Sequence, residues 1–205
     1  MEVRVKICGI TNLDDALAAI DFGADALGFV FFEKSPRWIS YKDAELIIKN
    51  LPPFITTIGV FVNQSSEQIK KIVSNVKIDA LQIYEQEITK LSAFSRQIIK
   101  VIRIKSLQSL EPLINFKDNV SAFLLDAYSP NSLGGTGKIF NWDIAVEAKK
   151  FGRIILAGGL TPENISEAVK HVRPYGVDVS GGVEAEKGKK DLKKLKLFIE
   201  RAKAA

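Results

Sequence analysis

Hydrophobic and polar positions along this chain alternate between two patterns, one typical of strands and the other typical of helices. Short runs rich in β-branched residues are typical of buried strands, and the longer segments between them carry apolar residues at helical spacing. The predicted strands are Val3–Cys8, Ala26–Phe31, Ile55–Val62, Ala80–Tyr84, Ile98–Ile104, Ala122–Asp126, Arg153–Ala157 and Val177–Ser180. The predicted helices are Leu13–Phe22, Tyr41–Leu51, Glu67–Val76, Ile88–Arg96, Leu107–Phe116, Trp142–Phe151, Pro162–Val172 and Lys190–Lys203. The pattern therefore predicts strict alternation of strand and helix.

This alternation predicts an α/β protein in which crossover helices join parallel strands. Eight repeats favour a single-domain (β/α)8 TIM barrel over residues 1–205, although this length is near the short end for that fold. An open, doubly wound sheet is the structural alternative. No linker, low-complexity stretch or shift in composition marks a second domain.

Several predicted helices begin with capping residues. Ser40 followed by Asp43, and Ser65 followed by Gln68, resemble capping boxes, in which two side chains satisfy free backbone N–H groups. The segment Thr161-Pro162-Glu163 offers a cap, a proline at the first helical position and a carboxylate near the positive helix end. These signals support the individual helices.

Composition narrows the class of protein. Hydrophobic residues make up 46% and charged residues 26%, as in ordinary globular enzymes. No apolar run is long enough to cross a bilayer, and the first residues form a predicted strand instead of a signal peptide, so we expect no membrane contact. The single cysteine excludes an internal disulfide and a cysteine-rich metal site, and it fits a reducing cytoplasm. The net charge of +5 is spread along the chain, so an anionic small-molecule substrate is expected and nucleic acid is not.

Two chemically active side chains stand at predicted strand ends. Cys8 ends the first strand, and the carboxyl ends of parallel strands form the active-site mouth of an α/β barrel. The alternative is a small buried hydrophobe, because free cysteine is among the most buried residue types. Asp126 closes the sixth strand, where its carboxylate could be a general acid or a cap for the amides of the next loop.

Two glycine pairs, Gly158-Gly159 and Gly181-Gly182, follow the seventh and eighth predicted strands. Glycine lets main-chain N–H groups approach a ligand, and the usual phosphate site of a barrel lies between these two loops. Phosphate binding is therefore favoured over a role in tight turns alone. The run 134–138 compares poorly with a nucleotide-binding P-loop, because Ser132 replaces a required glycine and Ile139 replaces the hydroxyl residue after the lysine.

Three further features are basic. Arg37 follows the second predicted strand, where a guanidinium could hold a carboxylate through two hydrogen bonds, although an isolated surface arginine is the default. His171, the single histidine, is expected at a helix end on the outer surface and not in catalysis. The last predicted helix has an apolar stripe suited to packing on the barrel; membrane or calmodulin-type binding is the weaker interpretation.

Together these motifs resemble the phosphoribosylanthranilate isomerase family. The matching segments are Lys6–Thr11, Ser35–Ser40, Leu125–Asp126, Gly134–Gly137, Phe140–Trp142, Ala157–Asn164 and Asp178–Glu184, in order along nearly the whole chain. The resemblance implies a barrel without cofactor or metal that performs an Amadori rearrangement in tryptophan biosynthesis. Its substrate would be N-(5-phosphoribosyl)anthranilate and its product the 1-deoxyribulose 5-phosphate derivative. The oligomeric state, monomer or homodimer, stays open.

The resemblance also implies roles for single residues. Cys8 would be the general base, Asp126 the general acid and Arg37 the partner of the anthranilate carboxylate, with Gln82 and Asp178 as further substrate contacts. The two glycine pairs would hold the phosphate. With reference pKa values of about 8.5 and 3.9, a thiolate and a protonated carboxyl rarely coexist at pH 7, so we expect burial to raise the pKa of the acid.

Two departures from the family pattern stand out. The segment Gln82–Glu85 places Tyr84 where the family usually has histidine, and Ser180–Gly182 has glycine where a second serine is usual. Two rival functions fit the sequence less well. The histidine-pathway isomerase uses aspartates on its first and fifth strands, which here end in Cys8 and Ile104. A non-catalytic phosphosugar-binding barrel would keep the glycine loops but need neither a thiol nor a carboxylate at strand ends.

Overall fold

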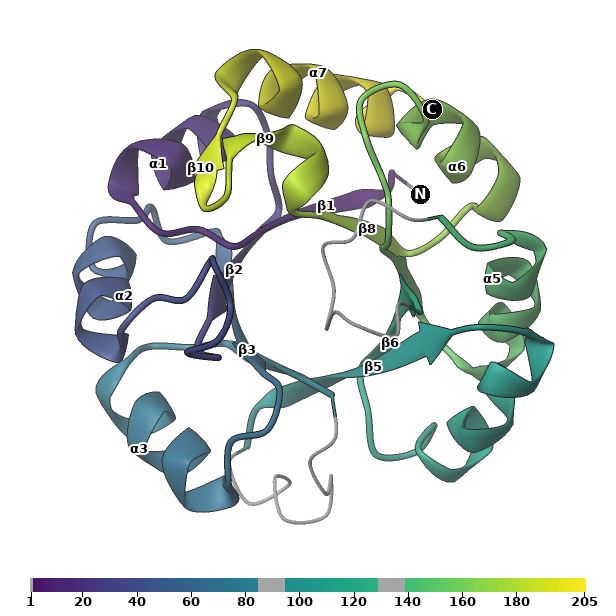
Figure 1. Ribbon diagram of the computed structural model, residues 1–205, viewed down its shortest axis with the longest axis horizontal. Helices are drawn as coiled ribbons and strands as arrows, with labels where there is room; N and C mark the ends of the chain where they lie inside the picture. Colours follow the sequence, from purple (N-terminus) through teal and green to yellow (C-terminus); the bar gives the residue numbers. More distant parts are fainter. Residues whose placement is uncertain (1, 85–94, 129–138) are drawn as a thin grey trace.

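The computed structural model describes residues 2–84, 95–128 and 139–205. Within them, eight parallel strands, β1 to β8, form a closed barrel. They are β1 (Arg4–Cys8), β2 (Ala26–Val30), β3 (Thr56–Phe61), β4 (Ala80–Ile83), β5 (Gln97–Ile104), β6 (Ala122–Ala127), β7 (Ile154–Leu156) and β8 (Gly176–Val179). Pairing of β8 with β1 closes the ring seen in Figure 1. Each strand starts and ends within one residue of its predicted bounds, and closure rules out the open sheet.

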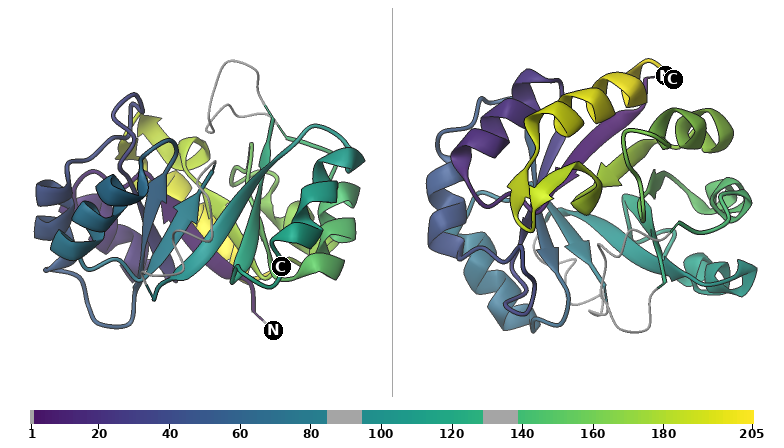
Figure 2. Two further views of the ribbon diagram at one scale, coloured as in Figure 1. Left: turned by 90° about the horizontal axis from the view of Figure 1, so that it is seen from below. Right: turned by 45° about the horizontal axis from the view of Figure 1, so that its top comes forward.

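Helices cover the outside of the ring, as Figures 1 and 2 show. The α-helices are α1 (Leu13–Asp21), α2 (Tyr41–Ile48), α3 (Ser66–Asn75), α5 (Asp143–Ala148), α6 (Ile165–Val172) and α7 (Leu192–Lys203), and the 3-10 helices are η2 (Leu107–Asn115), η3 (Lys149–Phe151) and η4 (Gly181–Val183). The predicted helix Ile88–Arg96 lies outside the described residues except for its last two positions. Among the described residues no helix is long and apolar enough to span a bilayer.

Two predicted helices differ from the structure because of proline and turn chemistry. The segment predicted as Leu107–Phe116 is the 3-10 helix η2, which contains Pro112; proline has no N–H to donate and clashes with the preceding turn of an α-helix. The helix predicted from Pro162 begins only at Ile165, because Thr161 and its neighbours form a separate turn closed by their own side chains.

The last predicted helix is shorter because a hairpin precedes it. Strand β9 (Glu184–Glu186) pairs antiparallel with β10 (Lys189–Lys190), and Asp191 caps α7, which begins at Leu192. Gly188, with φ of 85°, makes the turn of the hairpin. In Figure 2 this hairpin lies at the end of the barrel to which the strand arrows point, opposite the N-terminus.

The capping predictions hold at two helices. At α3 both bonds of a capping box between Ser65 and Gln68 are present, at 2.8 and 3.3 Å. At α2 the Ser40 hydroxyl accepts from the Asp43 amide at 3.1 Å and donates to its carboxylate at 2.6 Å. Each helix thereby satisfies backbone donors that have no partner within the helix.

Two apolar layers hold the barrel together. One lies between strands and helices and includes Val5, Ile7 and Phe198. The other fills the barrel interior and consists of Ile58, Ala80, Ile99, Val101, Ala122, Leu124, Ile155 and Ala157. A smaller apolar cluster of Cys8, Val30 and Val60 lies near the strand ends, and the polar side chains of Gln82, Asp126 and Asp178 line the cavity with it.

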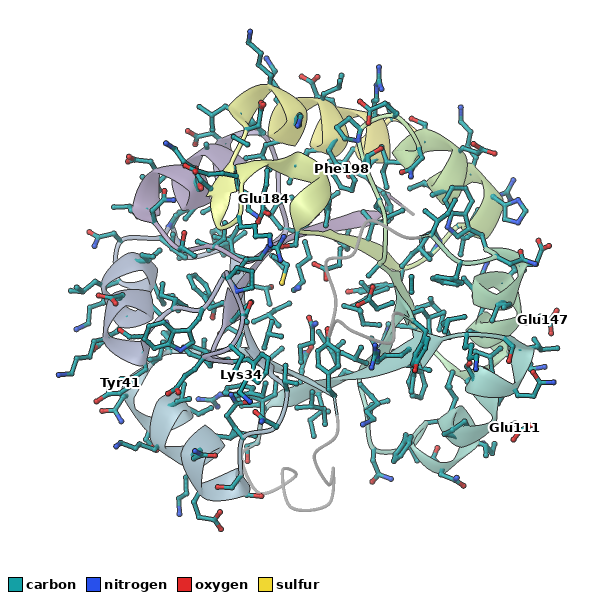
Figure 3. All side chains as sticks on the ribbon, in the orientation of Figure 1. Lys34, Tyr41, Glu111, Glu147, Glu184 and Phe198 are labelled. Carbon is teal, nitrogen blue, oxygen red and sulfur yellow. The ribbon has the colours of Figure 1, made fainter. Side chains whose placement is uncertain are left out.

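Phe198 carries much of the contact between α7 and the barrel. Its side chain is fully buried, and Figure 3 shows it between the helix and the ring. We expect Phe198→Ala to lower the free energy of unfolding by about 3–5 kcal/mol, because it removes apolar burial and leaves a cavity. Urea denaturation measures this. Leu197→Ala is the matched control: Leu197 is 37% exposed on the same helix, so its loss should stay below about 1 kcal/mol. Equal losses at both positions would contradict this packing.

Candidate active site

A cavity of about 910 Å³ opens among the carboxyl ends of the strands and the loops that follow them. Its lining includes all nine residues that the sequence nominated: Cys8, Arg37, Gln82, Asp126, Gly158, Gly159, Asp178, Gly181 and Gly182. They come from β1, β4, β6 and β8 and from the loops after β2, β7 and β8. The barrel thus gathers the predicted site residues around one space, at the end where barrel active sites lie.

Cys8 lies in the wall of this cavity and is 7% exposed as a residue. Its strand neighbour on β2 is Gly28, and a Cβ built at Gly28 would lie 2.9 Å from the sulfur, so only glycine leaves the thiol its room. Burial raises the pKa of the Cys8 thiol; the charge of Lys6 lowers it in part, and the charge of Asp178 raises it. The thiol is therefore both buried and in reach of a ligand.

Lys6 and Asp178 form a buried ion pair inside the barrel. The register of β1 on β8 sets the two residues side by side, and Lys6 Nζ donates to Asp178 Oδ1 at 2.7 Å. Burial works against the charge of Lys6, but Asp178 and Cys8 outweigh it, so the pKa of Lys6 is raised. Asp178 was nominated as a substrate contact, and one of its oxygens is already taken by Lys6.

Asp126 is buried at the end of β6 and lines the cavity. Burial, followed by the negative charge of Asp178, raises its pKa to about 6, while the Ala127 amide and Arg103 act in the opposite direction. This confirms the expectation that burial raises the pKa of this carboxyl. At pH 7 about one molecule in ten then carries the proton, compared with about one in a thousand for an unperturbed aspartate.

Arg37 is held by the hairpin that the sequence did not predict. Its Nε and Nη2 donate to the two oxygens of Glu184 at 2.8 and 2.7 Å. Lys190 donates to the same carboxylate at 3.0 Å and to the Cys8 carbonyl at 2.7 Å. Burial alone would raise the pKa of Glu184, but these two cations lower it. Figure 3 shows Glu184 beside the ring of strands. Through Glu184 and Lys190 the network links Arg37 to the carbonyl of Cys8 at the end of β1.

The glycine pairs shape the loops on which phosphate was expected. Gly158 and Gly159 have φ of 82° and 65°, which favours glycine. A Cβ at Gly158 would lie 2.5 Å from the Ala127 amide, and one at Gly182 only 1.9 Å from the Leu160 carbonyl. Both glycines are thus needed by the chain itself, whatever ligand the loops hold.

Two buried polar atoms that line the cavity have no hydrogen-bond partner among the described residues. They are the hydroxyl of Ser180, between the glycine pair and β8, and the amide oxygen of Gln82 on β4. Buried polar groups are nearly always paired, so unpaired ones facing a cavity indicate contacts that a ligand would supply. For Gln82 this agrees with its nomination as a substrate contact.

Tyr84 and Arg103 also line the cavity. Burial, and then the nearby charge of Asp126, raise the pKa of Tyr84 well above its usual value, so the phenol keeps its proton. Its side chain occupies the position where the family usually has histidine. Arg103 near the end of β5 and Lys6 in the middle of β1 were missed, because a polar residue within an apolar strand has no distinctive signal.

His171 lies away from the cavity. His171 bonds Asp143 at 2.8 Å on the exposed outer side, as predicted. Glu85 and the glycine-rich run 134–138 lie outside the described residues. Within the parts of the chain that are described, no three His, Cys, Asp or Glu side chains come together as a metal site.

Comparison with known proteins confirms the resemblance. A model of the family described as N-(5'-phosphoribosyl)anthranilate (PRA) isomerase matches residues 5–201. A curated relative of that name from Geobacter metallireducens is 53% identical over 203 residues, covering 98% of this chain and 100% of the relative. Another from Geobacter sulfurreducens is 52% identical, covering 98% of both chains.

Solved structures agree. Phosphoribosyl anthranilate isomerase from Thermotoga maritima is 43% identical with a TM-score of 0.91, covering 99% of this chain and all of the other. A phosphoribosyl anthranilate isomerase in complex with reduced 1-(o-carboxyphenylamino)-1-deoxyribulose 5-phosphate is 41% identical with a TM-score of 0.88, again over 99% and 100%. The chain is therefore an enzyme of tryptophan biosynthesis and belongs to the N-(5'-phosphoribosyl)anthranilate isomerase family.

Proposed function

We propose that Cys8 and Asp126 of this isomerase carry out an Amadori rearrangement by proton transfer alone. The substrate is N-(5'-phosphoribosyl)anthranilate and the product 1-(2-carboxyphenylamino)-1-deoxyribulose 5-phosphate. The observation that carries the proposal is the shared cavity: a buried thiol and a carboxyl whose pKa is raised to about 6 line one space with the two glycine loops. Because each step moves only protons and electron pairs within the substrate, the proposal includes no cofactor or metal.

The first step opens the sugar ring. Asp126 donates its proton to the ring oxygen, the bond from that oxygen to C1 breaks, and the nitrogen lone pair forms a Schiff base with C1. The thiolate of Cys8 then removes the proton from C2, and the electron pair of that C–H bond moves toward the iminium to give an enol with an amine at C1. The Asp126 carboxylate then takes the enol proton and the Cys8 thiol gives its proton to C1, which yields the ketone and restores both groups. The product has the atoms of the substrate, as an isomerisation requires.

The two working groups carry uncommon protonation states. At pH 7 about a tenth of the molecules have Asp126 protonated, while burial keeps the Cys8 thiolate below the roughly 3% of an unperturbed thiol. Both shifts have burial as their largest cause, so one feature helps the acid and hinders the base. Cations close to the sulfur are needed to offset the effect of burial on the pKa of the thiol.

Substrate binding is proposed at the rim of the cavity. Glu184 uses two of the five N–H donors of Arg37, so donors remain for the anthranilate carboxylate. The loops with Gly158 and Gly181 form part of the cavity lining. Their main-chain N–H groups and the Ser180 hydroxyl would hold the phosphate. A relative in the family has been solved with a phosphorylated ligand of this kind, which supports the assignment.

Removal of either acid–base group should act on turnover. We expect Cys8→Ala and Asp126→Asn each to lower kcat by about 10²–10⁴-fold with far smaller changes in KM, because each removes a proton transfer and leaves the binding groups in place. Loss of anthranilate fluorescence from freshly made substrate measures the rate. The control is His171→Ala, on the outer surface, which should leave both constants unchanged. Substantial turnover in Cys8→Ala would show that the thiol is not the base.

The pH profile should follow from a base whose pKa lies above that of the acid. Below pH 6 Asp126 is protonated and the thiolate fraction rises tenfold per pH unit, so kcat/KM rises. Between pH 6 and the raised pKa of Cys8, each unit gains thiolate and loses protonated Asp126 equally, so the profile is flat. Above that pKa it falls.

Asp126→Asn is the control for this profile, since its residual kcat/KM should continue to rise above pH 6 instead of becoming flat. Ionisation of the substrate phosphate would remain in both enzymes. A plateau that starts at the same pH in Asp126→Asn would contradict the assignment of the pKa near 6.

Arg37 should affect binding more than turnover. Arg37→Lys keeps the charge but loses the planar fork, so we expect KM to rise by about tenfold or more with a smaller change in kcat. Lys42, an exposed cation on α2 that does not line the cavity, is the control, and Lys42→Met should change KM less. If Arg37→Lys leaves KM unchanged, the charge and not the guanidinium geometry matters; if neither constant changes in Arg37→Ala, the side chain is outside the site.

A further inference from the structure

The register of two strand pairs fixes the side chains around the thiol. On one side of β1, Lys6 lies opposite Asp178 of β8; on the other side, Cys8 lies opposite Gly28 of β2. Lys6 and Cys8 are two residues apart on one strand, so their side chains point to the same face. That face is the barrel interior, because Lys6 bonds Asp178 there and Cys8 lines the cavity.

Gly28 provides the space in which these side chains meet. A Cβ built at Gly28 would lie 2.9 Å from Cys8 Sγ and 3.0 Å from Lys6 Nζ, so the sulfur and the nitrogen are at most about 6 Å apart. Lys6 is buried, and a cation removed from water needs nearby negative charge. Asp178 supplies one such charge at 2.7 Å, and an ionised thiol would supply a second.

Charged and titratable groups face the thiol from several elements. They are Lys6 on β1, Arg37 after β2, Tyr84 after β4, Asp178 on β8 and Lys190 on β10. Arg37 and Lys190 already share the Glu184 carboxylate, and Lys190 also binds a backbone carbonyl. Lys6 is the cation that lowers the pKa of the thiol most.

We propose that Lys6 is a positioning residue for the base: its ammonium, held by Asp178, stabilises the thiolate of Cys8 when the proton leaves. The inference rests on the proposed role of Cys8 as base and assigns it an electrostatic partner on the same strand. Asp178 acts on the thiol in two directions. It holds the ammonium in place, while its own negative charge disfavours the thiolate.

The single cysteine allows a direct test. The chain has one thiol, so the rate of alkylation by iodoacetamide reports on Cys8 alone. In Lys6→Met we expect the alkylation rate constant at pH 7 to fall at least tenfold, with the inflection of its pH profile moved up by at least one unit. Lys6→Arg keeps the charge and should recover most of the rate.

A second buried lysine serves as the control. Lys100 on β5 contacts the Tyr84 carbonyl and lies 5.4 Å from the centre of the Phe116 ring. Lys100→Met therefore removes a buried lysine that does not face the thiol, and the alkylation profile of Cys8 should not move. A matching shift in Lys100→Met would assign the effect to general loss of structure, which would contradict the proposal.

Two further variants distinguish the effect of the Lys6 ammonium from the effects of its neighbours. Lys6→Met also leaves Asp178 unpaired, so the substitution is repeated in an Asp178→Asn background, where the upward shift should persist. If the upward shift vanishes in that background, the unpaired Asp178 carboxylate caused the shift and the proposal is wrong. Gly28→Ala changes no charge, but its Cβ would lie 2.9 Å from the sulfur and 3.0 Å from the ammonium, so at least one of the two must move and the profile should also shift upward.

The outcomes decide the question even if one variant does not fold. Near-ultraviolet circular dichroism checks the fold of each, and Gly28→Ala with Lys6→Arg suffices where Lys6→Met is lost. Unchanged alkylation profiles in folded Lys6→Met, or in folded Gly28→Ala, overturn the proposal. Alkylation does not depend on turnover, so active Cys8→Ala would refute the base assignment without deciding how Lys6 acts on the thiol.

Discussion

Pairing of β8 with β1 is the constraint on which the whole site depends. It closes the sheet and sets Lys6 beside Asp178, although 172 positions separate them in the sequence. The same closure brings the hairpin after β8 against the end of β1, where Lys190 binds the Cys8 carbonyl and, with Arg37, the Glu184 carboxylate. An open sheet with the same strands would leave the first and last strand ends apart and expose charges that the barrel buries in pairs.

Burial is the largest single influence on both proposed working groups. It raises the pKa of Asp126 to about 6, which suits an acid at neutral pH, and raises the pKa of Cys8, which does not suit a base. The neighbouring charges act differently on the Asp126 carboxyl and the Cys8 thiol. For Asp126 the largest effect of a nearby charge is that of Asp178, which raises the pKa, whereas for Cys8 it is that of Lys6, which lowers the pKa. Pairs of titratable groups whose surroundings oppose one another are how one cavity holds both an acid and a base.

The strands, and most of the site, could be predicted from the sequence because they depend on local pattern. Cys8 and Asp126 end apolar runs, and the glycine pairs follow strands, so position in the repeat was enough. Lys6 could not be found this way. In β1 alternation suggests that Lys6 faces water, but in a barrel the apolar residues Val5 and Ile7 face the helices and the polar ones face inward. The hairpin with Glu184 was missed because its pairing spans only a few residues around Gly188.

The charge at the mouth connects this electrostatic arrangement to the proposed substrate. Lys6, Lys190, Arg37 and Arg103 face three carboxylates, those of Asp178, Glu184 and Asp126, and the last is partly neutral at pH 7. A ligand that carries a phosphate and a carboxylate brings negative charge into this cationic space. That charge favours the protonated form of Asp126 further, which helps the acid, and opposes ionisation of Cys8, which hinders the base. Because the substrate and the thiolate both add negative charge to this space, a fixed cation next to the sulfur is most needed after the substrate has bound. A lysine on the strand itself, buried and anchored by Asp178, meets that requirement in a way that a mobile surface lysine could not.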